Sequence, residues 1–293
     1  MDPRVELLRA FSRGFTVGAA KVETARHGLR FLDELLSSGG RLEYGELTPL
    51  RLVHRYKVVD IPDDRMDDLM RAHVDKELNV CRYFNPAAND TFCFNLDNNH
   101  RTHSGVVIPE MELAIRALWQ CLCELGCPPL IVASGRGFHV WCRLTESVDN
   151  DRLYRFMLPA AAVALASVHA AGYDHRNVKV NLYPHVQLQN AVSLRLFGSN
   201  HAKTGVFSHI WTVDGLLGEG ASWDCFEEFV RNPKVSPDAI DAARTTLVGG
   251  VDLTRAADAA RATRQCRGRF ASSFESDALR PCGVGNGSWH GGR

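Results

Sequence analysis

The chain has 293 residues, of which 45% are hydrophobic and 23% charged, and its 34 basic and 34 acidic side chains give a formal net charge of zero. This composition is typical of a globular protein that is large enough to bury a full core. The zero net charge argues against indiscriminate binding of nucleic acid through a global positive field, although it leaves room for a locally basic groove.

The sequence also argues against export and against a membrane span. No uninterrupted apolar run approaches the roughly 18–20 residues that cross a bilayer. Residues 1–6 lack the basic and then apolar pattern of a signal peptide. The nine cysteines are odd in number and scattered, which is unlike a secreted disulfide framework. We therefore predict a cytoplasmic protein with no membrane partner.

Residues 1–75 are predicted to form a mostly helical lobe, to which we assign no function. Leucines and a phenylalanine recur at helical spacing, at positions 7, 8, 11, 29, 32, 35 and 36. Two glycines at 39 and 40 end that pattern, and residues 56–61 form a short strand that stops at Pro62.

From Thr91 onward, the pattern changes to short β-rich runs separated by helices. The predicted strands are 92–97, 178–183, 192–197 and 206–213, with a hairpin of 130–134 and 138–143. The predicted helices are 109–125, 151–171, 223–231, 237–246 and 253–265. We divide the chain into the lobe, a core of residues 76–215, a helical part of the same domain at 216–272, and a Gly-rich tail or linker stub at 273–293.

The first motif is the strand with the sequence Phe-Cys-Phe-Asn-Leu-Asp at 92–97. Residues two apart in a strand point to the same face, so Asn95 and Asp97 project together. A pair of carboxylates at this spacing clamps two divalent cations about 3.5–4 Å apart in nucleotidyl transfer. Only Asp97 is an acid here. The alternative interpretation is that Asp97 merely begins a turn at Asn98 and Asn99.

The second motif, Ser-Gly-Arg-Gly-Phe-His at 134–139, is more specific. Its two glycines allow the backbone to approach a ligand closely. Arg136 carries a fork-shaped donor suited to phosphate, and Ser134 and His139 add donors on the flanking strands. This set suits the triphosphate of a nucleotide. The alternative is a plain hairpin turn with one exposed arginine.

The third motif runs from Ser193 to Gly205. The apolar residues at 192, 194 and 196 alternate with Ser193, Arg195 and Phe197, which predicts that these last three share the opposite face. His201, Lys203 and Thr204 follow on a loop, where they can converge with Arg195 on a phosphate group. The alternative is a solvated basic loop.

A cysteine cluster at 121, 123 and 127 is predicted to be structural. Residues two apart on a helix point about 200° away from each other, so Cys121 and Cys123 cannot share a zinc ion. Free, buried cysteines on an apolar helix are the better account.

Taken in order, the three motifs resemble those of the archaeo-eukaryotic primase superfamily, which includes the primase-polymerases of plasmids, phages and related mobile elements. The resemblance covers about residues 90–213. It implies an α+β fold in which mixed or antiparallel sheets form an RRM-like primase-polymerase catalytic core flanked by helices. It also implies a DNA-directed nucleotidyltransferase that uses Mg²⁺ or Mn²⁺, nucleoside triphosphates and a DNA template or primer. The Gly-rich end suggests that a helicase or accessory domain once followed.

The resemblance assigns roles by position. Asp97 matches the second acid of the first motif and Asn95 stands where the first acid is expected. A third acid is expected on the polar face of strand 178–183, where Asn181 is the best match and Lys179 an alternative alignment; Asp174 lies several residues earlier. The residues that match triphosphate contacts are Ser134, Arg136, His139, Arg195, His201 and Lys203.

The chain departs from the family at the metal site. A carboxylate attracts a divalent ion by on the order of 8 kcal/mol at 4 Å and an effective dielectric of about 20, before desolvation is subtracted. Amides at 95 and 181 therefore predict impaired metal binding with the nucleotide contacts retained. Two explanations fit: a deliberately inactivated enzyme, or a natural homologue that has become a non-catalytic nucleotide- or nucleic-acid-binding module of a replication or defence system.

Overall fold

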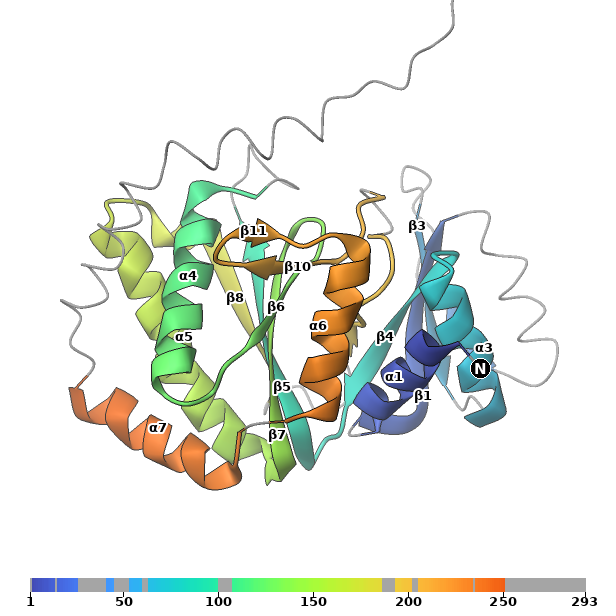
Figure 1. Cartoon of the computed structure of the whole chain (residues 1–293), viewed down its shortest axis with the longest axis horizontal. Coiled ribbons are helices and arrows are strands. Elements are labelled where there is room, and N and C mark those ends of the chain that lie inside the picture. Colours follow the sequence, from blue (N-terminus) through green and yellow to red (C-terminus); the bar gives the residue numbers. More distant parts are fainter. Residues whose placement is uncertain are drawn as a thin grey trace, which may run out of the picture.

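The computed structural model describes residues 2–13, 15–25, 41–44, 53–59, 63–99, 107–185, 193–201, 205–233 and 235–250. Its described strands form two sheets whose ladders are antiparallel, and helices pack against both (Figure 1). The predicted α+β class with antiparallel sheets is confirmed.

The five-stranded sheet has the order β2-β3-β1-β4-β9. Its strands are β1 (Phe15–Ala25), β2 (Arg41–Tyr44), β3 (Val53–Val59), β4 (Leu78–Phe84) and β9 (Ser193–Arg195). The six-stranded sheet has the order β11-β10-β6-β7-β5-β8. Its strands are β5 (Ala88–Asn98), β6 (Leu130–Ala133), β7 (Gly137–Asp149), β8 (Val178–Tyr183), β10 (His209–Thr212) and β11 (Gly215–Leu216).

The described helices begin and end at recognisable signals. They are α1 (Pro3–Ser12), α3 (Asp63–Val74), α4 (Pro109–Glu124), α5 (Asn150–Ala170), α6 (Glu219–Arg231), α7 (Pro237–Gly250) and the short 3₁₀-helix η2 (His175–Asn177). Proline occupies the first turn of α4, and Gly126, with φ +72°, follows its end. The Asp149 side chain caps α5 by accepting hydrogen bonds from the backbone N–H groups of Asp151 and Arg152.

Two hydrophobic cores lie on opposite faces of the six-stranded sheet. On one face, Phe92, Phe94 and Leu96 of β5 join a core with α4, α5 and α7. On the other face, Cys93 and Trp141 join a core with α1, α3, α6 and the five-stranded sheet. In Figure 1, α4, α5 and α7 accordingly lie on one side of the sheet and the N-terminal elements on the other. Successive residues of β5 therefore point alternately into the two halves of the molecule.

The prediction of a mostly helical lobe over residues 1–75 left out two strands that the structure describes there, β1 and β2. Between α1 and α3 the structure places β1, β2 and β3. The backbone groups of β1 pair with β3 on one side and β4 on the other, a long-range arrangement that no local leucine spacing reports. The predicted short strand at 56–61 is confirmed as β3, whereas the leucines at 29–36 lie outside the described residues.

The remaining elements are largely as predicted. The strands predicted at 192–197 and 206–213 are shorter, as β9 and β10, while α6 begins earlier than expected, after Gly218. β5 continues to Asn98, so Asp97 does not begin a turn. The helix predicted at 253–265 and the tail at 273–293 lie outside the described residues, and the domain boundaries remain predictions.

Of the helices that the structure describes, α5 alone has the length and apolar composition of a membrane span, and half of its most apolar stretch is buried. Its buried residues include Phe156, Met157 and Ala160. The helix packs against α4, α7 and strands of the six-stranded sheet. This packing accounts for its apolar character as that of a core helix.

Candidate functional site

The centre of the candidate site is the end of β5, which lies between β7 and β8. Asn95 stands opposite His139 of β7 and opposite Asn181 of β8. Asp97 stands opposite Gly137 and Lys179. Residues of the first motif therefore lie directly opposite residues of the second motif on one side, and opposite the strand predicted to carry the third metal ligand on the other. Because Phe94 and Leu96 face the helical core, Asn95 and Asp97 face the five-stranded sheet.

Two amides donate hydrogen bonds to one carboxylate oxygen. Asn95 Nδ2 donates to Asp97 Oδ2 at 2.9 Å, and Asn181 Nδ2 donates to the same oxygen at 3.5 Å. Asn95 is 8% exposed, and its Oδ1 is buried with no hydrogen-bond partner among the described residues. The negative charge of Asp97 is thus met by neutral N–H donors in the positions where metal ligands are expected.

These residues do not fit a two-metal site. Such a site holds its ions between carboxylate oxygens, and of Asn95, Asp97 and Asn181 only Asp97 is a carboxylate, one of whose oxygens already accepts two hydrogen bonds. Across the described part of the chain, no group of three or more His, Cys, Asp or Glu side chains could hold a metal ion.

Tyr183 also belongs to this face, although the sequence alone assigned it no role. It lies two residues after Asn181 on β8, opposite Cys93, and its ring stacks on Phe84 with 5.9 Å between centroids. Burial, aided by nearby Cys93 and Asp97, raises the pKa of Tyr183 to about 12. Its hydroxyl is therefore a neutral group beside Asn95. The period-two alternation of β8 was the signal that could have found it.

The second motif forms the turn between β6 and β7. The Ser134 backbone N–H donates to Gly137 O at 2.8 Å, and Gly135 has φ +88°, a conformation that favours glycine. A Cβ at Gly137 would lie 2.1 Å from the backbone oxygen of Leu96. Gly137 is therefore required by the close approach of β7 to β5, and not by a ligand as the sequence suggested. Arg136 lies half-exposed at the tip of the hairpin.

The third motif docks on the second through Arg195. This residue comes from β9 of the other sheet, is 7% exposed, and donates a guanidinium hydrogen bond to Ser134 O. Burial, together with nearby Arg195 and His201, lowers the pKa of His139 to about 3. His139 is therefore a neutral imidazole, which donates from one ring nitrogen and accepts at the other.

The alternation predicted for residues 192–197 ends at Arg195. Phe197, expected beside Arg195, is instead in the core, where its ring lies 4.8 Å from that of Trp223. The reason is that β9 stops at Arg195 and the chain turns at Gly198, which has φ +103° and no room for a Cβ beside Trp223.

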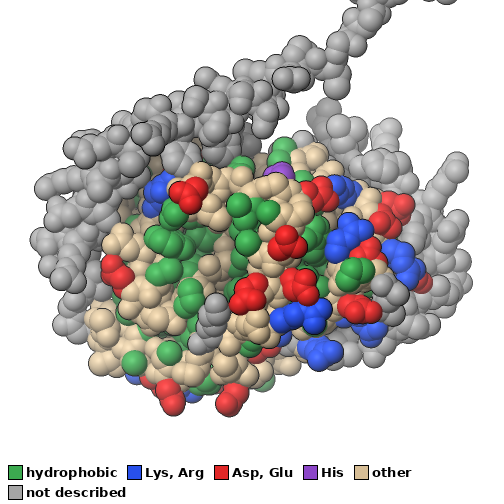
Figure 2. All heavy atoms as spheres, in the orientation of Figure 1, with side chains coloured by type: hydrophobic (Ala, Val, Ile, Leu, Met, Phe, Trp, Pro, Cys, Tyr) green, Lys and Arg blue, Asp and Glu red, His purple; other side chains and the backbone are tan. Residues whose placement is uncertain are grey.

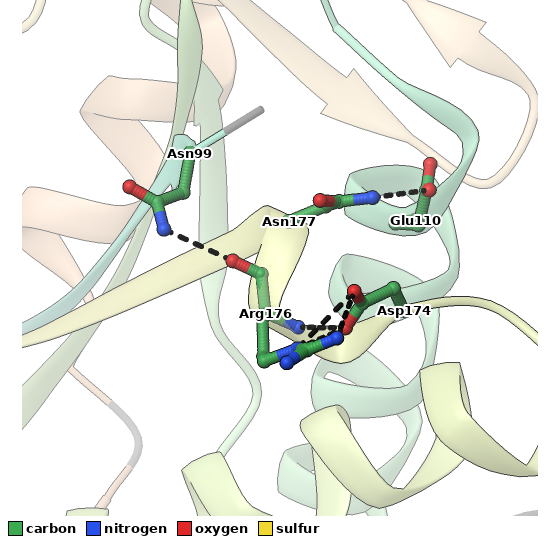
Figure 3. A network of polar contacts seen from close by, with 5 residues as sticks. All are labelled: Asn99, Glu110, Asp174, Arg176 and Asn177. Atoms are coloured by element: carbon green, nitrogen blue, oxygen red, sulfur yellow. Dashed lines mark hydrogen bonds and ion pairs between the residues drawn. The ribbon is translucent and has the colours of Figure 1, made fainter. Parts of the chain in front are cut away.

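Asp174 does not supply the missing acid. It caps η2 and pairs with Arg176 at 2.9 Å (Figure 3), and hydrogen bonds from Arg176 lower the pKa of Asp174 to about 2. The surrounding network fixes the start of β8. Asn99 donates from its backbone N–H to Asn177 O at 2.8 Å and from Nδ2 to Arg176 O at 3.0 Å. Asn177 Nδ2 in turn donates to Glu110 Oε1 at 3.1 Å.

The cysteine cluster carries free thiols. Cys121 and Cys123 are half-buried on α4, and Cys127 is buried just beyond it. Burial raises the pKa of Cys121 to about 11 and that of Cys127 to about 12, which keeps both thiols protonated.

The structure brings together most of the predicted site residues. Those at the junction of β5, β6, β7, β8 and β9 are Asn95, Asp97, Ser134, His139, Asn181 and Arg195. His201 is close enough to lower the pKa of His139, and its loop is closed by the Gly205 N–H, which donates to His201 O at 2.8 Å. Lys203 lies outside the described residues.

Comparison with solved structures gives a weak likeness, and comparison with sequences gives none. No protein-family model matches the chain, and no curated protein matches it. The polymerase domain from Mycobacterium tuberculosis Ligase D, solved in complex with DNA, resembles the structure with a TM-score of 0.38 and 17% identity, over 87% of this chain and 91% of that chain. A likeness of this strength assigns no activity and no residue role to the chain.

Proposed function

We propose that the chain is a primase-polymerase-type nucleotidyltransferase domain that binds a nucleoside triphosphate where the three motifs meet. The observation that carries this proposal is their convergence. Asn95 stands between His139 and Asn181, and Arg195 donates to the backbone of Ser134 from a strand of the other sheet. Motifs up to 100 residues apart in the sequence thus share one site on the face between the two sheets.

The site offers the chemistry that a triphosphate requires. Arg136 and Arg195 supply permanent positive charge, and His201 adds an imidazole close to His139; Lys203, which we propose as a further contact, lies outside the described residues. Ser134 offers a hydroxyl and His139 a neutral imidazole. Charge-assisted hydrogen bonds from such groups hold phosphate oxygens and would neutralise charge as pyrophosphate leaves.

The proposed partner is a DNA template or primer, held by phosphate contacts and base stacking without sequence-specific readout. In the chain as written, nucleotidyl transfer is impaired because Asn95 and Asn181 occupy the positions of acids. With acids restored at both positions, the proposed cofactor is Mg²⁺ or Mn²⁺. A cytoplasmic setting and a fused or separate helicase are parts of the same proposal.

One observation favours a second candidate, a non-catalytic nucleotide- or nucleic-acid-binding module. The Asn95 and Asn181 amides satisfy Asp97 Oδ2 directly, so the site is internally hydrogen-bonded without a cation. A protein that only binds nucleotides needs nothing more from these three residues. In that case the phosphate contacts are used for recognition, and nucleotide binding is largely insensitive to Mg²⁺.

Single-turnover primer extension separates the two candidates. We expect the chain as written to extend a primed template poorly or not at all, and the variant Asn95→Asp with Asn181→Asp to gain extension in Mn²⁺. Adding Asp97→Asn to that variant is the matched control and removes the gain. If the double variant binds nucleotide but makes neither extension product nor dinucleotide, the chain is a binding module.

A further inference from the structure

We propose that Lys179 is a phosphate-binding residue whose ammonium provides, beside Asp97, the positive charge that a divalent cation provides in a two-metal site. This inference rests on the proposed function, because it concerns how the same triphosphate is held. It assigns to the chain a mode of nucleotide binding that needs no metal ion.

The register places Lys179 at the site. Lys179 is the direct cross-strand partner of Asp97 on β8, and Asn181, two residues later, donates to Asp97 Oδ2. Residues two apart in a strand share a face, so Lys179, Asn181 and Asp97 lie on the same side of the sheet. Cβ atoms of directly opposed residues lie about 4.5–5.5 Å apart, which is within the length of a lysine side chain.

The ammonium of Lys179 is available. Its side chain is exposed, and it makes no ion pair or hydrogen bond with any residue that the structure describes. Other described cations have partners of their own: Lys76 pairs with Glu219 at 2.6 Å, and Arg176 pairs with Asp174 at 2.9 Å. Within the described part of the chain, Lys179 is therefore a charge on the site face that is not used in an ion pair.

The strand that carries Lys179 is held in place. The network in Figure 3 ties Asn99, at the end of β5, to Arg176 and Asn177, at the start of β8, and ties Asn177 to Glu110 of α4. Lys179 follows this anchor by two residues. The backbone of Lys179 is therefore held opposite Asp97 by the β5–β8 ladder and by the hydrogen bonds at the start of β8.

The charge at this point requires a cation. Asp97 adds a negative charge beside a triphosphate that already carries several, and like charges a few ångströms apart are strongly unfavourable. The amides of Asn95 and Asn181 donate hydrogen bonds to Asp97 but bring no net charge. Lys179, directly opposite Asp97 on β8, does bring one, and a lysine ammonium is a common phosphate ligand.

Equilibrium titration of ATP and dATP in EDTA tests the proposal. The variants are Lys179→Gln, which removes the charge, and Lys179→Arg, which keeps it. The matched control is Arg155→Gln, which removes a positive charge from an exposed position on α5, on the far side of the six-stranded sheet. We expect Lys179→Gln to weaken binding about tenfold, with Lys179→Arg and Arg155→Gln close to the unchanged chain.

The outcomes are distinguishable. If the unchanged chain binds neither ATP nor dATP, whether in EDTA or in Mn²⁺, the proposed function itself fails. If it binds in EDTA and Lys179→Gln binds equally well, the proposed function stands and the role of Lys179 is wrong. Binding by the unchanged chain in Mn²⁺ but not in EDTA also overturns the metal-independent mode. Circular dichroism of each variant shows that the fold is retained, as expected for an exposed position.

Discussion

At the scale of single residues, the central feature is the replacement of charge by hydrogen bonding around Asp97. Asn95 Nδ2 lies 2.9 Å from Asp97 Oδ2. A carboxylate at position 95 would bring two oxygens to about this separation on a largely buried face. Asn95 therefore satisfies Asp97 without a cation, whereas an aspartate at position 95 would make the site depend on one.

This argument predicts the stability of Asn95→Asp. We expect the substitution to lower the free energy of unfolding at pH 7 by about 1–3 kcal/mol in EDTA, since it buries a second carboxylate and replaces a hydrogen bond by repulsion. Mn²⁺ should restore part of this loss. The measurement is urea unfolding followed by circular dichroism in EDTA and in Mn²⁺.

The exposed substitution Asn232→Asp, at the end of α6, is the control, because it adds the same charge outside the site. An Asn95→Asp variant as stable in EDTA as this control would show that Asp97 is not its neighbour in solution.

At the scale of elements, a buried histidine ties α3 to the strand that carries Arg195. His73 is fully buried, its Nδ1 accepts from the Val80 N–H at 3.0 Å, and its Nε2 donates to Phe197 O at 2.9 Å. Burial lowers the pKa of His73 to about 4, and the positive charge of Arg195 acts in the same direction. The neutral ring thus joins α3, β4 and Phe197 of the third motif.

His73 predicts a dependence of stability on pH. Between pH 6.5, the ordinary value for histidine, and pH 4, the unfolded chain binds a proton that the folded chain does not. The free energy of unfolding should therefore fall by about 3 kcal/mol from this residue as the pH drops through that window, and the contribution is complete above it. His139, also neutral and buried, acts in the same sense.

Urea unfolding at several pH values measures this slope. His73→Gln should reduce the slope of the free energy of unfolding against pH by the contribution of one proton. His175→Gln, at an exposed position on η2, should leave the slope unchanged. Equal slopes for His73→Gln and the unchanged chain would contradict the assignment.

The same scale shows what the sequence could and could not predict. The hairpin of β6 and β7 follows from alternation around two glycines, and α4 follows from its proline, apolar stripe and glycine. Both signals are local. The strands β1 and β2 were missed because their long-range pairing, of β1 with β3 and β4 and of β2 with β3, is set by the fold. Gly137 was recognised as special, but its reason, the backbone of Leu96, lies on another strand.

At the scale of the whole molecule, the site lies where the core between the two sheets gives way to polar side chains. Along the same face of the six-stranded sheet, Cys93 and Trp141 are buried in that core, and Asn95 and His139 follow at its edge. Arg195 reaches this edge from the other sheet. The sequence grouped these residues by motif, but only the packing of two sheets shows that they meet.

The distribution of charged side chains on the surface is consistent with the zero net charge of the chain. Figure 2 shows acidic and basic side chains interspersed over the described part of the face in view. Described side chains on α6 include partners in ion pairs, such as Arg231 with Glu227 at 2.6 Å. Binding of a polyanion is therefore expected to depend on the local basic groups of the site rather than on an extended positive surface.

The most direct test of the central claim is an equilibrium titration of a nucleoside triphosphate against the unchanged chain, in Mn²⁺ and in a chelator, repeated with Asn95→Asp and Asn181→Asp together. The account predicts that the unchanged chain binds in both conditions, and that the double variant binds only when Mn²⁺ is present. Absence of binding by the unchanged chain in either condition would contradict it, because the converging motifs would then hold no triphosphate.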